Sequence, residues 1–499
     1  MSNDATVIVS DAVRAFVQRD FGLFIGGTQQ RAHSERRLDV FNPASGERLA
    51  TVADADATDV DHAVSNARAA FDARVWSGLR PADRERILLR FADLLETNAE
   101  DLAQLETLNQ GKSINIARAV EVGATIEYVR YMAGWATKIT GETLDVSIPF
   151  PPGTRYTAFT RKEPIGVVAG IVPWNFPLMI AVWKLVPALA AGCTIVIKPS
   201  PETPLTALRL AELALEAGVP AGVFNVVTGG RECGAALAAH PGLSKISFTG
   251  STPTGKLVGT AAVQNMTRFS LELGGKNPAV MLADIDVEQA IQGALAGGFF
   301  NQGQVCAAAS RIYVHRSKYR QVADGLADIA NAMTLGPGLD PAAQINPLVS
   351  ALHRDRVNQH IARAQSAGLK FLAGGKPVDL PGYYVRPTVI ADVPHDAAIV
   401  RDEVFGPVLA VVPFDDPLEA LRLANDSQYG LAASLWSNDL KTVMNLVPRM
   451  EAGTVWVNCH VPLDPGMPFG GFKQSGIGRE FGKYAIEGFT ETKSVCIAH

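Results

Sequence analysis

The chain has 499 residues, which is too long for a single hydrophobic core, so we expect two or more domains. Hydrophobic residues make up 47% of the chain and charged residues 19%, an ordinary composition for a globular enzyme. The net charge is -5 and Lys and Arg are not clustered, so neither nucleic acid nor an anionic membrane is expected as a partner.

The five cysteines show no paired spacing, which argues against a disulfide framework and for a reducing compartment. The segment Met1–Ala5 lacks the basic and apolar regions of a signal peptide, so we expect a cytoplasmic protein. The apolar stretches 165–172 and 185–197 are too short and too interrupted to span a membrane. Cys and His residues show no metal-ligand spacing, and we expect no catalytic metal.

Helical periodicity dominates residues 57–139, where Thr58 or Asp59 is the expected cap of the first helix. Residues 141–160 then form extended segments interrupted by prolines, which predict an exposed β-hairpin. An exposed strand edge favours pairing with another chain.

Short apolar runs alternate with helical stretches from residue 165 onward. The expected strands are 165–172, 194–198, 223–227 and 245–249, with helical stretches such as 204–217 between them. This rhythm is typical of a parallel, doubly wound α/β sheet. A second alternating series runs from residue 279 to about 482.

The strand at 165–172 ends in the loop Pro173-Trp174-Asn175-Phe176-Pro177. Asn175 therefore follows the carboxyl end of a strand, where open α/β sheets bind their ligands. Its side-chain amide is a candidate donor to an oxyanion, although an Asn in a Pro-rich turn more often caps backbone groups.

Two later segments place reactive groups on separate loops. Glu272 precedes a Gly-Gly turn in Leu271–Pro278, and Cys306 follows a polar, Gly-containing turn in Phe299–Cys306. Cys306 is the candidate nucleophile and Glu272 the candidate base. A single Cys is more often a small buried hydrophobic residue, and the other four cysteines keep that interpretation.

Residues 248–255, Phe-Thr-Gly-Ser-Thr-Pro-Thr-Gly, end a strand and open a helix. Backbone amides and a helix N-terminus there offer a site for a phosphate, although an ordinary turn between a strand and a helix has the same pattern. The chain contains no Gly-x-Gly-x-x-Gly fingerprint.

Three of these motifs, Pro-Trp-Asn-Phe-Pro, Leu-Glu-Leu-Gly-Gly-Lys and Asn-Gln-Gly-Gln-Val-Cys, resemble in order and spacing those of the NAD(P)-dependent aldehyde dehydrogenase superfamily. Family-like motifs cover nearly the whole chain, the others being Lys198–Ser200, Phe248–Thr252, Glu403–Pro407 and Pro468–Gly476. The resemblance implies an α/β fold with two doubly wound parallel-sheet domains and a β oligomerisation arm.

The resemblance also implies domain boundaries and an assembly. Residues 1–140 and 161–274 would form the nucleotide-binding domain, 275–485 the catalytic domain, and 141–160 with 486–499 the arm. We therefore expect a homotetramer or a homodimer.

The resemblance assigns roles to the candidate catalytic residues. Cys306 would attack the aldehyde, and the Asn175 amide and the Cys306 backbone N–H would hold the oxyanion. Glu272 would activate water to hydrolyse the resulting thioester. Lys184 matches a lysine that the family places near the oxyanion, although a solvated helix lysine is the alternative.

The implied cofactor is NAD, with NADP as the alternative. The residues implied to bind it are Ile171, Val172, Trp174, Lys198, Gly230, Gly234, Phe248, Gly250, Ser251, Gly255, Glu403 and Phe405. Many NAD-dependent members carry a glutamate three residues after the lysine, where it repels a 2'-phosphate. Here that position is Pro201, with Glu202 one residue later, so exclusion of NADP is in doubt.

The expected substrate pocket contains Phe176, Trp183, Phe300 and Cys459. Aromatic walls favour an aromatic aldehyde, and within the family the chain most resembles phenylacetaldehyde dehydrogenases. The alternatives are an aliphatic aldehyde or semialdehyde, transfer of the acyl group to coenzyme A, and a catalytically silent paralogue. The retained Glu272 argues against the coenzyme A alternative.

Overall fold

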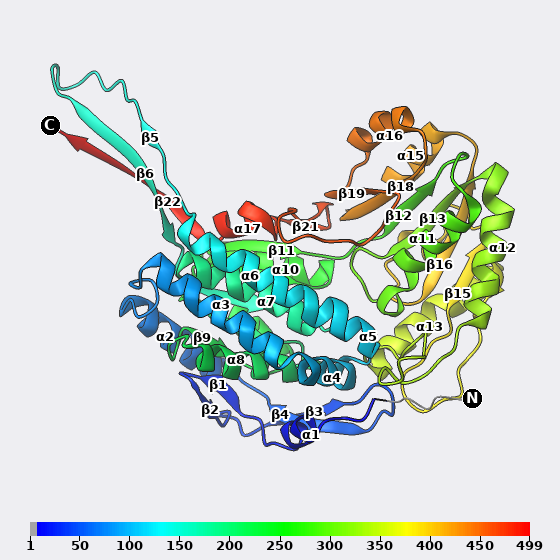
Figure 1. Cartoon of the computed structure of the whole chain (residues 1–499), viewed down its shortest axis with the longest axis horizontal. Helices are drawn as coiled ribbons and strands as arrows, with labels where there is room; N and C mark the ends of the chain where they lie inside the picture. Colours follow the sequence, from blue (N-terminus) through cyan, green and yellow to red (C-terminus); the bar gives the residue numbers. More distant parts are fainter. Residues whose placement is uncertain (1–6) are drawn as a thin grey trace.

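Two large sheets with their helices form two lobes, and a β arm projects from one of them (Figure 1). The structure is a computed structural model that describes residues 7–499. Residues 1–6 lie outside the described part, and with them the Met1–Ala5 segment and the start of the 1–140 range. No helix in the described residues is long and apolar enough to cross a membrane.

The first sheet has eight strands in the order β2-β1-β9-β8-β7-β10-β11-β21. Its members are β1 (Leu23–Ile25), β2 (Thr28–Gln30), β7 (Val167–Ile171), β8 (Thr194–Lys198), β9 (Phe224–Val226), β10 (Lys245–Thr249), β11 (Arg268–Glu272) and β21 (Gly476–Ile477). Strands β7 to β11 run parallel, and β8 and β10 flank β7 on opposite sides. The strand order therefore reverses at β7, so the carboxyl end of β7 is the switch point where such sheets bind ligands.

Alternate residues of β7 face two separate cores. Val167 and Ala169 pack with helices α2 (Ala57–Asp72), α9 (Arg231–Ala238) and α10 (Thr252–Gln264). Val168 packs with the helices of the other face, α3 (Pro81–Thr97), α4 (Ala99–Gln110), α6 (Ala124–Ala133), α7 (Pro177–Ala191) and α8 (Leu205–Ala217). The strand is buried on both faces, as a doubly wound sheet requires.

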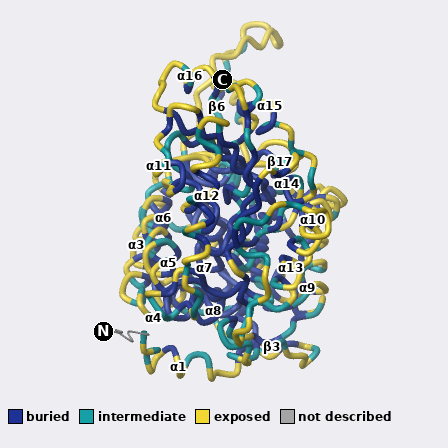
Figure 2. Tube along the Cα trace, turned by 90° about the vertical axis from the view of Figure 1, so that its right-hand side faces the viewer, coloured by how far each residue is buried: buried dark blue, intermediate teal, exposed yellow. Residues whose placement is uncertain are grey.

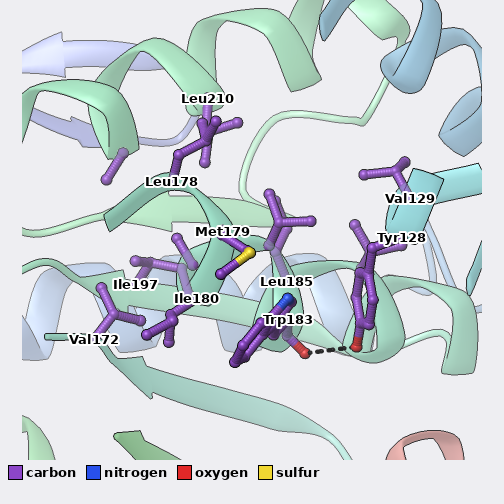
Figure 3. Packing of buried hydrophobic residues seen from close by; sticks show 14 of the residues in the cluster. Tyr128, Val129, Val172, Leu178, Met179, Ile180, Trp183, Leu185, Ile197 and Leu210 are labelled. Atoms are coloured by element: carbon purple, nitrogen blue, oxygen red, sulfur yellow. Dashed lines mark hydrogen bonds between the residues drawn. The ribbon is translucent and has the colours of Figure 1, made fainter. Parts of the chain in front are cut away.

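Helix α7 lies at the centre of the larger core. Every residue from Pro177 to Ala191 is buried, and Figure 3 shows Met179, Ile180 and Trp183 projecting from it toward neighbouring elements. The Tyr128 hydroxyl of α6 donates to the Trp183 carbonyl at 3.3 Å. This rigid helix begins immediately after the Asn175 loop.

The predicted helical region, 57–139, consists of several helices with one departure from regular geometry. Besides α2, α3, α4 and α6 it contains α5 (Ile114–Ile116), the π-helical turn η1 (Ala117–Gly123) and the 3-10 turn η2 (Gly134–Thr137). The prediction that Thr58 or Asp59 caps α2 is wrong. Asp56 is the cap, and the Asp59 carboxylate accepts a hydrogen bond from the Asp56 backbone N–H in a capping box.

The second sheet has seven strands in the order β14-β15-β16-β13-β12-β18-β19. These are β12 (Asn277–Met281), β13 (Ala309–His315), β14 (Lys370–Ala373), β15 (Thr388–Ala391), β16 (Val408–Phe414), β18 (Ala432–Trp436) and β19 (Thr454–Val457). Its helices are α11 (Val287–Phe299), α12 (Arg316–Ala332), α13 (Ala351–Ser366), α14 (Ala398–Arg401), α15 (Pro417–Asn425) and α16 (Leu440–Leu446). Apart from the antiparallel edge strand β14, the sheet is parallel, which is the architecture expected for the second lobe.

The arm consists of β5 (Thr143–Leu144), β6 (Tyr156–Pro164) and β22 (Thr490–Ala498). Strand β22 pairs antiparallel with β6 from Thr490 opposite Pro164 to Ala498 opposite Tyr156. The burial colouring shows most of the arm exposed (Figure 2). Strand β6 continues past the predicted end of the arm segment at 160, and β22 starts after the predicted 486 because α17 (Gly482–Glu487) precedes it.

The remaining elements are α1 (Asp11–Val17), β3 (Arg37–Phe41), β4 (Arg48–Ala53), the 3-10 turns η3 (Phe300–Gly303) and η4 (Val447–Arg449), β17 (Tyr429–Gly430) and β20 (Phe472–Lys473). Strand β21 falls in the range predicted for the catalytic domain, yet it pairs with β11 of the first sheet. The exact domain boundaries stay a prediction.

Candidate active site

Two cavities meet at Cys306. The first, which we call the aromatic cavity, has a volume of about 460 Å³ and includes Phe176, Trp183 and Phe300 in its wall. The second, the polar cavity, has a volume of about 260 Å³ and includes Asn175, Ser251 and Glu403. Thr249, Leu273 and Cys306 line both. A reactive group at Cys306 can therefore meet one molecule from each side.

The turn before Cys306 is tightly constrained. Asn301, Gln302 and Gly303 all have positive φ, at 46°, 57° and 70°. A Cβ at Gly303 would lie 2.2 Å from the Gly406 carbonyl oxygen, so only glycine fits there. The Asn277 amide donates to the Cys306 carbonyl at 2.8 Å and anchors the loop to β12.

The Cys306 thiol is protonated in this environment. Burial raises its pKa to about 12, and the negative charges of Glu403 and Glu272 act in the same direction. The backbone amides of Ala307 and Cys306 oppose the shift but do not outweigh it. A thiol becomes an effective nucleophile only after it has lost its proton.

Asn175 is tied to the Cys306 loop at two points. Its Nδ2 donates to the Gln304 carbonyl at 3.1 Å, and its own carbonyl accepts from Asn301 Nδ2 at 3.2 Å. The side chain is buried and lines the polar cavity. The amide predicted from the sequence as an oxyanion donor thus lies beside the nucleophile loop.

Glu272 ends β11 and lines the aromatic cavity. Glu272 is 4% exposed, and neither of its carboxylate oxygens has a hydrogen-bond partner among the described residues. Burial raises its pKa well above the usual range, and the charge of Glu480 raises it further. An unpartnered buried carboxyl with a raised pKa is suited to general-base work near neutral pH.

Lys184 does not line either cavity. Its Nζ donates to Glu480 Oε1 at 2.6 Å and to Ser247 Oγ at 3.1 Å, and its side chain is fully buried. The charge of Lys184 opposes the rise in the pKa of Glu272. Its influence on the site is therefore electrostatic, and Glu480 is a partner that the sequence analysis did not predict because no motif singled it out.

Residues 30–495 match the Aldehyde dehydrogenase family. The chain is 50% identical over 480 residues to phenylacetaldehyde dehydrogenase of Pseudomonas fluorescens, covering 96% of both chains. The chain belongs to the aldehyde dehydrogenase family. It is an oxidoreductase that acts on aldehydes.

Other similar proteins belong to the same family. Retinal dehydrogenase 2 of Homo sapiens is 41% identical, with 95% of this chain and 91% of that protein covered. The NAD+ complex of aldehyde dehydrogenase from Bacillus cereus superposes with a TM-score of 0.96 at 43% identity, covering 99% of both chains. The family and the fold class predicted from the motifs are confirmed.

In this aldehyde dehydrogenase the polar cavity collects five of the predicted cofactor residues: Trp174, Gly250, Ser251, Glu403 and Phe405. Burial raises the pKa of Glu403 to about 7, while the Gly275 N–H, which donates to it at 2.9 Å, opposes the shift. His353, Arg356 and His360 of α13 complete the cavity. The sequence analysis missed them because they lie on a helix without a recognisable motif.

The other predicted cofactor residues lie along the same edge of the first sheet. Lys198 is buried, with its Nζ donating to the Pro199 carbonyl at 3.0 Å, and a Cβ at Gly234 would lie 3.4 Å from its Cε. Gly230 is the cap of α9. The remaining four pack in the cores beneath this edge: Ile171, Val172, Phe248 and Gly255. Their roles toward a cofactor stay predictions.

The aromatic cavity contains three of the four residues predicted for the substrate pocket. Phe176 and Phe300 stack with ring centroids 6.1 Å apart at 23°, and Trp183 lies in the same wall. The structure does not place the fourth residue, Cys459, in the wall. Asn458 before it adopts a φ of 53°, and His460 to Leu463 line the cavity instead. The sequence analysis also missed Tyr128, Trp456, Phe469 and Phe481, which converge from distant elements.

Proposed function

We propose that this aldehyde dehydrogenase oxidises an aromatic aldehyde of the phenylacetaldehyde type to the carboxylic acid, with NAD+ as the oxidant. The observation that carries the proposal is the 460 Å³ cavity walled by aromatic side chains, with Cys306 in its lining. Aromatic rings favour an aromatic ligand through apolar contact and ring stacking. The 50% identity to a phenylacetaldehyde dehydrogenase supports the same substrate class.

The polar cavity and the neighbouring sheet edge fit a dinucleotide. Ser251 caps α10, whose N-terminus favours an anionic phosphate. Glu403 offers carboxylate oxygens to ribose hydroxyls, and Trp174 and Phe405 supply aromatic surface. NAD, when bound, supplies the hydride acceptor for the oxidation.

The chain's own groups perform the remaining steps. The Cys306 thiol passes its proton to solvent water and its sulfur adds to the aldehyde carbon, while the Asn175 amide with the Cys306 N–H stabilises the oxygen that becomes negative. Loss of hydride from that carbon leaves a thioester on Cys306. Glu272 then takes a proton from a water molecule as the water oxygen attacks the thioester, and this proton passes to the departing Cys306 sulfur as the acid is released.

A panel of aldehydes assayed with NAD+ and NADP+ tests the proposal through the absorbance of the reduced nucleotide. We expect kcat/KM for phenylacetaldehyde to exceed that for acetaldehyde by roughly 10-fold or more, since each buried methylene adds about 0.8 kcal/mol of apolar contact. Equal values for short aliphatic aldehydes would contradict the aromatic class. Activity that requires coenzyme A would favour the acylating alternative.

The arm supports a second part of the proposal, assembly into a homotetramer or homodimer. Its apolar side chains are exposed in the single chain. We also propose a reducing compartment such as the cytoplasm, because the five cysteines are all unpaired.

A further inference from the structure

A buried lysine that the reaction steps above do not use contacts the oxyanion loop. Lys112 follows α4, and its side chain has no exposed surface. Its Nζ donates to the Asn175 carbonyl at 3.0 Å, and it lies 4.3 Å from the ring centroid of Phe176. A fully buried ammonium is costly unless it is paired, so its retention at this point requires compensation from nearby carboxylates.

Two carboxylates supply that compensation. Glu121 forms an ion pair with Lys112, and Glu106 Oε2 lies 3.9 Å from the Lys112 Nζ. Both carboxylates also bind the first turn of α7, since Glu106 Oε1 accepts from Leu178 N at 3.1 Å and Glu121 Oε1 from Met179 N at 2.9 Å. Helix α7 has no cap of its own, because the residue at its N-cap is Phe176.

The carbonyl of Asn175 is consequently held from two sides. Lys112 donates to it from the helical layer, and Asn301 donates to it from the nucleophile loop. The side-chain amide of the same residue reaches the Gln304 carbonyl, two residues before Cys306. Loss of either donor leaves the Asn175 backbone less constrained relative to the sulfur.

The element that carries Glu121 is also part of the cavity wall. Glu121 belongs to the π-helical turn η1, from which Val120 and Ala119 line the aromatic cavity. π-helical turns are rare and often occur at functional sites. Here the turn presents the carboxylate to Lys112 while its neighbours face the cavity.

We propose that Lys112, supported by Glu121 and Glu106, is a positioning residue that aims the Asn175 amide at the oxyanion. The proposal rests on the proposed function of Asn175. A displacement of about 1 Å in a catalytic group costs roughly 100-fold in rate, which sets the size of the expected effect.

A double-mutant cycle on the first turnover tests the coupling. The measured quantity is the rate constant of the burst of reduced nucleotide in Lys112→Met, Asn175→Ala and the combined variant. We expect Lys112→Met to slow the burst by roughly 10- to 100-fold and Asn175→Ala by roughly 100- to 1,000-fold. The combined variant should be within about threefold of Asn175→Ala, because the lysine acts through the amide that is already absent.

If the combined variant slows the burst by the product of the two single effects, Lys112 does not act through Asn175. That result would overturn the positioning role while leaving the role of Asn175 intact. A full-rate burst in Asn175→Ala would overturn the oxyanion role in the proposed function, and this inference with it. The dissociation constant for NAD+ should change by less than about twofold in Lys112→Met, since Lys112 itself does not line the polar cavity.

A second variant guards against a simple failure to fold. Lys112→Met leaves the buried Glu121 carboxylate without its positive partner, whereas Lys112→Met combined with Glu121→Gln removes both charges. We expect this pair to recover much of the thermal stability while the burst stays slow. Recovery of the burst together with stability would show that the ion pair is structural only.

Arg84→Met is the matched control. Arg84 is a buried cation in the same lobe, and its guanidinium donates to the Leu79 carbonyl without contact to Asn175. Its replacement should lower stability and leave the burst within about twofold of the parent. A burst as slow as that of Lys112→Met would mean that any loss of a buried cation has the same effect, and would overturn the proposal.

Discussion

Cys306 shows why a single residue type cannot be assigned a role without its surroundings. Burial alone would leave it as inert as Cys193, whose pKa burial raises to about 11. Cys306 differs because it lines two cavities and lies beside the Glu272 carboxyl. Access to the thiol and a neighbouring base, rather than a lowered thiol pKa, identify the nucleophile.

Replacing Cys306 by Ala should abolish aldehyde oxidation, because no other group can form the thioester. Steady-state assays should find less than a few per cent of parental turnover, while NAD+ binding measured by protein fluorescence stays within about threefold. Cys496→Ala, on the exposed β22 strand, is the control and should retain full activity. Turnover above a few per cent in the Ala variant would refute the assignment of the nucleophile.

Glu272→Gln should separate formation of the thioester from its hydrolysis. Rapid mixing should show a burst of reduced nucleotide followed by slow turnover, since the base is needed only for the water step. Because burial raises the pKa of Glu272, hydrolysis in the parent enzyme should accelerate as pH rises, and this dependence should be absent in the variant. Absence of both burst and enzyme-bound thioester would mean that Glu272 acts earlier, on the thiol.

Glu403→Gln should alter how stability depends on pH. The Glu403 carboxyl ionises near pH 4.5 when unfolded but has a pKa of about 7 when folded, mainly because of burial. The folded chain thus holds a proton that the unfolded chain has released, so the contribution of Glu403 to stability falls as pH rises between these values.

The Glu403→Gln variant has no carboxyl at this position, so its stability does not fall with pH for this reason. It should therefore gain stability relative to the parent between pH 5 and pH 8, by up to about 3 kcal/mol in denaturant unfolding. Glu216→Gln, at an exposed position of α8, should show no such trend. A variant that loses stability relative to the parent at pH 8 would contradict the burial argument.

At the residue scale, the sequence patterns predicted which loops carry the reactive groups, but they did not predict which residues each group contacts. Asn175 follows β7, Glu272 ends β11 and Cys306 precedes β13, and each belongs to a motif that the sequence displays. The sequence could not decide the role of Lys184, because its contact with Glu480 joins residues 296 positions apart. Cys459 was misplaced for a related reason: the left-handed Asn458 redirects the chain after β19.

At the element scale, the strands of the first sheet agree closely with the apolar runs. The strands predicted at 194–198 and 245–249 have the observed bounds of β8 and β10, because buried parallel strands form continuous apolar runs between turns. The π-helical turn η1 was not predictable, since residues 117–123 show no sequence pattern that separates them from the α-helices on either side.

We expect the loop after β8 to control the choice of nucleotide. Its Glu202 accepts a hydrogen bond from the Ser200 hydroxyl, and although burial lowers the pKa of Lys198, the charge of Glu202 opposes that shift. A carboxylate in this position repels a 2'-phosphate, whereas Pro201 offers neither charge nor N–H. Discrimination against NADP should therefore depend on Glu202.

Glu202→Ala should relax the preference for NAD, and Pro201→Glu should strengthen it. A partly buried carboxylate facing the phosphate contributes roughly 1 to 3 kcal/mol, or about one to two decades in the NAD to NADP ratio of kcat/KM. Steady-state kinetics with both nucleotides measure the ratio. Strong rejection of NADP that survives Glu202→Ala would show that another part of the site makes the choice.

At the scale of the whole molecule, the reactive groups come from both lobes. Glu272 ends the last parallel strand of the first sheet, and Cys306 follows α11 of the second lobe, so the cavities exist only when the lobes are packed together. Segment 475–487 strengthens this packing, because β21 pairs with β11 and Phe481 joins the core around α7. Such long-range contacts are the part of the architecture that local sequence patterns do not contain.

The last feature of the whole molecule is the arm, whose exposed apolar residues predict assembly. Phe150 is 75% exposed, and Ile148 lies on the same segment between β5 and β6. Replacing both by Glu should shift the protein to smaller assemblies in light scattering coupled to size exclusion, because burying a carboxylate in an apolar interface costs several kcal/mol. Thermal unfolding should change little, since β6 stays paired with β22. Leu440→Glu, at a 71% exposed position of α16, should leave the mass unchanged. An unchanged mass in the arm variant would exclude this segment from the interface.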